Sequence, residues 1–137
     1  MSMSNRTILV VDDEAAQRDL IRAILHQEAY TVLEASDFDD ALAVQQKHLG
    51  EVDLLLIDLS LPGGNGYDLS SALLAFEPHL KVLIVSGHAG AELCKFFDMP
   101  LTDMHFLQKP FTSRELLRRV KSVMESPDPM AGRASAL

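Results

Sequence analysis

The sequence predicts an α/β fold, a doubly wound five-stranded parallel sheet in the order 2-1-3-4-5 with helices on both faces. Short apolar runs that suit buried strands alternate five times with stretches of helical periodicity. The run of large apolar residues over 54–57 is too short for a helix that buries one stripe, and it suits a strand covered on both faces. Right-handed crossovers make this strand order the common solution for five such units.

Length, composition and charge limit the classes of protein to which this chain can belong. With 137 residues, 47% of them hydrophobic and 23% charged, the chain is expected to form one folded domain. No stretch approaches the roughly 18 apolar residues of a membrane span, and the polar first seven residues predict no signal peptide. The single cysteine, Cys94, predicts no internal disulfide, so we expect a cytoplasmic protein without membrane insertion. A net charge of -8 argues against direct nucleic-acid binding.

The first half of the chain predicts strand, helix, strand and helix over residues 6–11, 14–27, 30–35 and 38–48. Three acids, residues 12–14, directly follow the first strand. Asp37 is placed to cap the second helix, which Gly50 ends.

The central strand ends at Asp58, and the turn residues from Pro62 to Gly66 then predict a loop. The remaining pattern predicts helices and strands over residues 65–76 (helix), 81–85 (strand), 89–97 (short helix), 104–108 (strand) and 112–124 (helix). Thr112 and Glu115 predict a capping box on the last helix. We expect one domain over residues 5–125, followed by a disordered tail over residues 126–137.

Five polar residues fall at the carboxyl ends of four predicted strands: Asp12, Asp13, Asp58, Ser86 and Lys109. Each one alone is typical of a helix start, a turn or a surface lysine. Ligands of open α/β sheets bind at this edge, and three neighbouring carboxylates repel one another unless a hard cation such as Mg²⁺ joins them. A carboxylate nucleophile, a metal, a lysine and a hydroxyl are the groups that phosphoryl transfer needs.

Four motifs carry a resemblance to a known family. They are Ile-Leu-Val-Val-Asp-Asp-Glu at 8–14, Leu-Ile-Asp-Leu-Ser-Leu-Pro-Gly-Gly-Asn-Gly at 56–66, Val-Ser-Gly at 85–87 and Phe-Leu-Gln-Lys-Pro-Phe at 106–111. In this order they resemble the response-regulator receiver domain of two-component signalling, a flavodoxin-like (βα)5 domain. The resemblance implies a switch that accepts a phosphoryl group from a histidine kinase or phosphotransfer protein. It implies no enzyme activity beyond the domain's own phosphoryl transfer and slow autodephosphorylation.

The resemblance also implies roles for individual residues. Asp58 would accept the phosphoryl group. Asp13, Asp58 and the backbone carbonyl of Ser60 would hold Mg²⁺ or Mn²⁺, with Asp12 acting through water.

Ser86 and Lys109 would contact the phosphoryl oxygens. Ser86 and Phe106 would form the switch that changes the surface of the fourth helix, fifth strand and fifth helix. Ser60 and His88 would flank the path of the water that hydrolyses the phosphorylated aspartate.

The chain departs from the family pattern near its output surface. Residues 101–104 replace the usual Gly-Ala before the last strand, the fourth predicted helix is short, and Phe106 has no hydroxyl. The amino-acid sequence of residues 106–111 is similar to that of receivers attached to hybrid sensor kinases. The sequence leaves open whether the domain acts alone or within a larger chain, which kinase and downstream partner it meets, and whether its phosphorylated form dimerises.

Three other classes of protein share parts of this pattern. A haloacid-dehalogenase-like phosphatase would have a second aspartate where this chain has Ser60. A flavodoxin-like carrier of flavin mononucleotide would place its phosphate where residues 12–14 would repel it. A receiver-like interaction module without phosphorylation would have lost a site residue, and this sequence has lost none.

Overall fold

The computed structural model describes residues 6–61, 64–65, 69, 71–73, 75, 77, 79–87 and 105–126, with the backbone alone for residues 60, 64 and 65. Several predictions fall outside these residues. They concern the helix over 89–97, all but the first residue of the tail over 126–137, Cys94 and His88.

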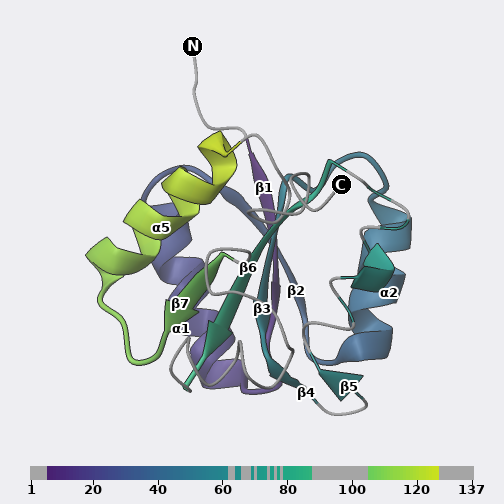
Figure 1. Cartoon of the computed structure of the whole chain (residues 1–137), viewed down its shortest axis with the longest axis horizontal. Helices are drawn as coiled ribbons and strands as arrows, with labels where there is room; N and C mark the ends of the chain where they lie inside the picture. The colour runs from purple at the N-terminus through teal and green to yellow at the C-terminus, as the bar shows by residue number, and fades with distance from the viewer. Residues whose placement is uncertain are drawn as a thin grey trace, which may run out of the picture.

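The main sheet has five parallel strands in the order β2-β1-β3-β6-β7. These strands are β1 (Thr7–Val11), β2 (Thr31–Ala35), β3 (Leu54–Asp58), β6 (Lys81–Ser86) and β7 (Phe106–Gln108). Counted along the chain, this is the predicted order 2-1-3-4-5, which is therefore confirmed. The strands all point to the lower edge in Figure 1, so their carboxyl ends meet there.

Helices cover both faces of the sheet (Figure 1). α1 (Ala15–His26) and α5 (Ser113–Glu125) lie on one face, and α2 (Phe38–Lys47) lies on the other. Residues 69, 71–73 and 75 are also helical, and the buried Leu69 and Leu73 pack in the same cluster as Ala41 of α2. None of the helices in the described part of the chain is long and apolar enough to cross a membrane.

Strand alternation divides the apolar side chains between two cores. On β3, Leu54 and Leu56 face α1 and α5, whereas Leu55 and Ile57 face α2. All four side chains are at most 1% exposed. The four-residue apolar run is therefore a strand buried on both faces, as a parallel sheet requires.

The predicted helix starts are confirmed by their caps. The Asp37 carboxylate accepts a hydrogen bond of 2.8 Å from the Asp40 amide at the start of α2. Thr112 and Glu115 form a reciprocal capping box, with hydrogen bonds of 2.8 and 3.0 Å, at the start of α5.

The segment after β3 differs from the prediction. Within the loop predicted from Pro62 to Gly66, Gly64–Asn65 (β5) pairs with Ser60–Leu61 (β4) in a small antiparallel ladder, and Asn65 therefore cannot begin the predicted helix over 65–76. Turn residues such as Pro and Gly are equally compatible with a loop and with a short hairpin. Only the pairing of Ser60 with Asn65 distinguishes the two.

Two helical residues have a burial that their polarity alone would not indicate. Leu20 on α1 is 53% exposed although it is apolar, and Gln45 on α2 is 1% exposed although it is polar. Both exceptions arise because the surface that a helix buries is set by the elements that cover it, not by its own composition alone.

Candidate functional site: an acidic pocket at the carboxyl edge of the sheet

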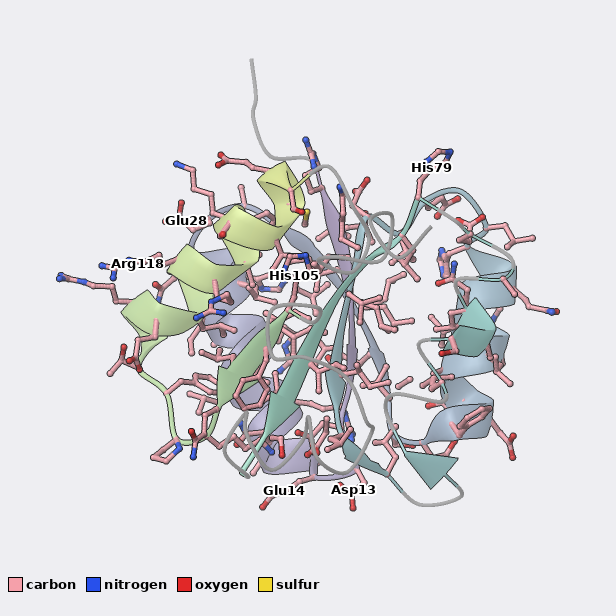
Figure 2. All side chains as sticks on the ribbon, in the orientation of Figure 1. Asp13, Glu14, Glu28, His79, His105 and Arg118 are labelled. Atoms are coloured by element: carbon pink, nitrogen blue, oxygen red, sulfur yellow. The ribbon has the colours of Figure 1, made fainter. Side chains whose placement is uncertain are left out.

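Asp12 and Asp13 follow β1 at the carboxyl edge, in the turn before α1. Asp12 is 3% exposed, its amide donates to the Ala35 carbonyl at 3.2 Å, and its Oδ1 accepts from the Glu14 amide at 2.9 Å. Asp13 is exposed, and Figure 2 shows Asp13 and Glu14 at this edge, opposite the end of the sheet where His79 lies. The turn therefore fixes one carboxylate inside the protein and leaves the next at the surface.

Asp58 and Lys109 complete the pocket from neighbouring strands. Asp58 is the last residue of β3, and Lys109 directly follows β7. The Lys109 Nζ donates to Asp58 Oδ2 at 2.9 Å and lies 3.7 Å from Asp12 Oδ2. One carboxylate oxygen each of Asp12, Asp13 and Asp58 lies within 4.8 Å of the others. The structure thus brings together four of the five residues that the sequence placed at this edge.

The charges in the pocket are not balanced at Asp12. Burial raises the pKa of the Asp12 carboxyl above its usual range, and the hydrogen bond from the Glu14 amide lowers it. The negative charges of Asp58 and Asp13 raise this pKa, whereas the positive charge of Lys109 lowers it. For Lys109, burial alone would lower the pKa of the ammonium. The hydrogen bond to Asp58 and the nearby carboxylate charges more than offset this and raise that pKa.

The donor set fits a hard divalent cation. Three carboxylates supply only oxygen ligands, and Mg²⁺ takes oxygen ligands while keeping several waters. A single lysine cannot neutralise three carboxylates, so the pocket carries excess negative charge. Asp12, Asp13 and Asp58 are thus chemically suited to Mg²⁺ or Mn²⁺.

Ser86 lies beside this pocket, at the end of β6. It is 2% exposed, pairs in register with Gln108, and its carbonyl accepts a hydrogen bond of 2.7 Å from the Lys109 amide. Strand alternation places Ser86 and Ile84 on one face of β6, and Ile84 is the register partner of Phe106. Ser86 and Phe106 are therefore diagonal neighbours on the same face of the sheet.

Phe106 is partly buried and packs against the core on the α2 face. Its carbonyl accepts a hydrogen bond of 2.8 Å from Arg119 of α5. The residue thus connects the strand beside the pocket to the last helix. For the two positions expected to control hydrolysis, the Ser60 side chain and all of His88 lie outside the described part of the structure.

Sequence reasoning missed Arg18. This α1 residue donates from its guanidinium to the carbonyl of Asp12 at 2.7 Å. A usable signal was present: Arg18 and Arg22 are one helical turn apart, and Glu34 on β2 is an acid with which both can pair.

Comparison with known proteins agrees with this site. The family model of the response regulator receiver domain matches residues 8–121. The chain belongs to the response regulator receiver domain family. Phosphorylation-controlled switching is general to this family, and its members bind Mg²⁺ at an acidic pocket of the kind that Asp12, Asp13 and Asp58 form here.

Curated relatives include the phosphate regulon transcriptional regulatory protein PhoB of Klebsiella pneumoniae. It is 34% identical over 92% of this chain and 55% of its own length. The transcriptional regulatory protein CpxR of Escherichia coli is 32% identical over 85% of this chain and 48% of its own length. The chain thus spans about half the length of these relatives. By their names they are regulators rather than classical enzymes.

Solved receiver domains share the fold. The receiver domain of the hybrid histidine kinase CckA is 31% identical with a TM-score of 0.73, covering 87% of this chain and 99% of that one. The CheY-like receiver domain protein of Methanospirillum hungatei is 30% identical with a TM-score of 0.75, covering 89% and 95%.

Proposed function

We propose that this chain is a phosphorylation-dependent signalling switch whose acceptor is Asp58. The arrangement that carries the proposal is the Asp58 carboxylate at the end of the central strand, 2.9 Å from the Lys109 ammonium and grouped with Asp12 and Asp13. The donor would be a phosphohistidine of a histidine kinase or phosphotransfer protein.

In this reaction a carboxylate oxygen of Asp58 attacks phosphorus and forms a new P–O bond. The P–N bond to the donor imidazole breaks, and the imidazole takes up a proton as it leaves. The Lys109 ammonium can turn from the Asp58 oxygen to a phosphoryl oxygen without leaving the pocket, since it already lies between two carboxylates. Such transfer depends mainly on positioning and charge stabilisation.

Asp13, Asp58 and the Ser60 backbone carbonyl would hold Mg²⁺, with Asp12 acting through water. When bound, the ion neutralises charge on the carboxylates and the phosphoryl oxygens. Ser86 and Lys109 would then bind the remaining phosphoryl oxygens.

The switch would run from Ser86 through Phe106 to α5. A phosphoryl group adds nearly two negative charges, and the Ser86 hydroxyl can move to bind it. The partly buried Phe106 is a diagonal neighbour of Ser86 and can repack when the β6 end moves. Its backbone bond to Arg119 supports transmission to α5, which together with β7 is the described part of the proposed output surface.

The phosphorylated state would decay by slow autodephosphorylation, with Ser60 and His88 beside the attacking water. Replacing either residue should change the dephosphorylation rate, measured by loss of the phosphorylated species, without changing the melting temperature. If the rate stays the same in both variants, these side chains do not flank the water.

The acceptor is tested by incubating the protein with acetyl phosphate and Mg²⁺ and locating the adduct by mass spectrometry. We expect one phosphoryl group on Asp58, lost in Asp58→Asn and with chelator, but kept in Asp39→Asn, which removes an exposed carboxylate of α2. An adduct that persists in Asp58→Asn would contradict the assignment. Absence of any adduct in the folded wild type would favour a receiver-like module that works without phosphorylation.

A further inference from the structure

Arg18 connects the acidic turn to the neighbouring strand β2. Its NH1 donates to the Asp12 carbonyl at 2.7 Å, and its Nε pairs with Glu34 Oε1 at 3.3 Å. The Arg18 side chain is 19% exposed, so these bonds form largely away from water. One guanidinium thus holds a backbone carbonyl and a carboxylate at the same time.

The Asp12 carbonyl belongs to the planar peptide unit that also contains the Asp13 amide. By holding this carbonyl, Arg18 sets the orientation of the plane between the two acids. The Asp12 side chain is also fixed by burial and by the Glu14 amide. Asp13 is exposed, so the direction of its carboxylate depends much more on the backbone.

Glu34 in turn fixes the position of Arg18. Its second oxygen lies 2.5 Å from NH1 of Arg22, and Arg22 also pairs with Asp19 at 3.2 Å. Glu34 is therefore held between two guanidinium groups of α1, of which only Arg18 reaches Asp12. A lysine at position 18 could not replace it fully, because an ammonium on a flexible stem lacks the planar fork that makes two directed bonds.

We propose that Arg18 is a positioning residue for the divalent metal site: it presets the Asp12–Asp13 peptide so that the Asp13 carboxylate faces Asp12 and Asp58. This rests on the proposed function, in which Asp13 holds Mg²⁺. The sign of the effect is diagnostic. A positive guanidinium near the pocket repels a cation, so on charge alone its removal would strengthen Mg²⁺ binding. If Arg18 positions the Asp13 carboxylate, its removal should instead weaken Mg²⁺ binding.

The experiment uses the full chain with three variants, Arg18→Met, Arg18→Lys and Arg22→Met. Mg²⁺ affinity is measured by titration calorimetry. We expect it to fall about tenfold in Arg18→Met, as for other groups that orient metal ligands, and by less in Arg18→Lys. Arg22→Met, which also loses a Glu34 partner but no bond to Asp12, should stay within about twofold of wild type.

Two further readouts separate positioning from general structural loss. In metal-free protein the amide resonance of Asp13 should shift in Arg18→Met but not in Arg22→Met, since only the former releases that peptide plane. In phosphorylation by acetyl phosphate, the Mg²⁺ concentration for half-maximal rate should rise about tenfold, while the rate at saturating Mg²⁺ changes little.

Unchanged or tighter Mg²⁺ binding by Arg18→Met overturns the proposal, as does an equal loss in Arg22→Met. If Arg18→Met does not fold, Arg18→Lys decides by the same criterion. A wild type that binds Mg²⁺ but is never phosphorylated would refute the proposed function and leave this inference standing.

Discussion

Replacing Asp12 by Asn should stabilise the metal-free protein and abolish most of its stabilisation by Mg²⁺. Asp12 is a carboxylate that is 3% exposed and faces two others. Asparagine retains the oxygen that accepts from the Glu14 amide and removes the charge. The change therefore isolates the electrostatic cost of the pocket.

The magnitude follows from opposing contributions. In an effective dielectric of about 20, the Asp58 charge, with a carboxylate oxygen within 4.8 Å, opposes ionised Asp12 by at least roughly 3 kcal/mol, and Lys109 at 3.7 Å offsets this by a similar amount. Asp13 adds a smaller repulsion, since it is exposed to screening water. The two carboxylates together repel ionised Asp12 more than Lys109 attracts it, and the larger cost of burying the carboxylate adds to this repulsion. We expect a net gain of about 1 kcal/mol for Asp12→Asn.

The stability gain in Asp12→Asn also depends on pH. Because the pKa of Asp12 is raised in the folded protein above 3.8, its contribution to stability is fully present below pH 3.8 and is lost as the pH rises through the folded pKa. The gain in Asp12→Asn should therefore be seen at neutral pH and disappear in acid.

Thermal unfolding measures both effects. A gain of about 1 kcal/mol corresponds to about 4 °C in the melting temperature of a domain of this size. Mg²⁺ at ten times its dissociation constant should add about 1.4 kcal/mol to the wild type and much less to Asp12→Asn. Asp39→Asn on α2 is the charge-matched control. A lower metal-free melting temperature for Asp12→Asn, or an undiminished response to Mg²⁺, would refute the reasoning.

Three further predictions concern the core, a helix cap and the switch. Gln45→Met should raise the free energy of unfolding in urea by about 1–2 kcal/mol, because both polar atoms of this buried amide lack hydrogen-bond partners within the described part of the chain; the exposed neighbour variant Gln46→Met should change it little. Thr112→Ala should lower it by about 1 kcal/mol through loss of the capping box, and a loss below a few tenths would show that the box contributes little. Addition of beryllofluoride with Mg²⁺ should shift NMR resonances of Phe106 and α5 in the wild type, and Ser86→Ala should shrink those shifts; silence of α5 in the wild type would contradict the switch.

The sequence alone determined the order of the main elements and the edge at which the site lies. Apolar periodicity and capping residues are local signals, so β1, β3, β6 and α5 could be recognised within one or two residues of their ends. The handedness of crossovers then left one common strand order. Because parallel strands end at the same edge, connectivity was enough to gather Asp12, Asp13, Asp58 and Lys109 there.

Only the tertiary structure decided which of these groups touch. Lys109 binds Asp58 more closely than Asp12, and Arg18 holds the Asp12 carbonyl, because side chains from strands distant in sequence are placed by packing between layers. Local patterns carry no such distances.

The same limit explains the errors. Gln45 is buried because of what covers α2, and the β4–β5 ladder exists because Ser60 pairs with Asn65. Burial and strand pairing are properties of two segments in contact, so the sequence of either segment alone does not determine them.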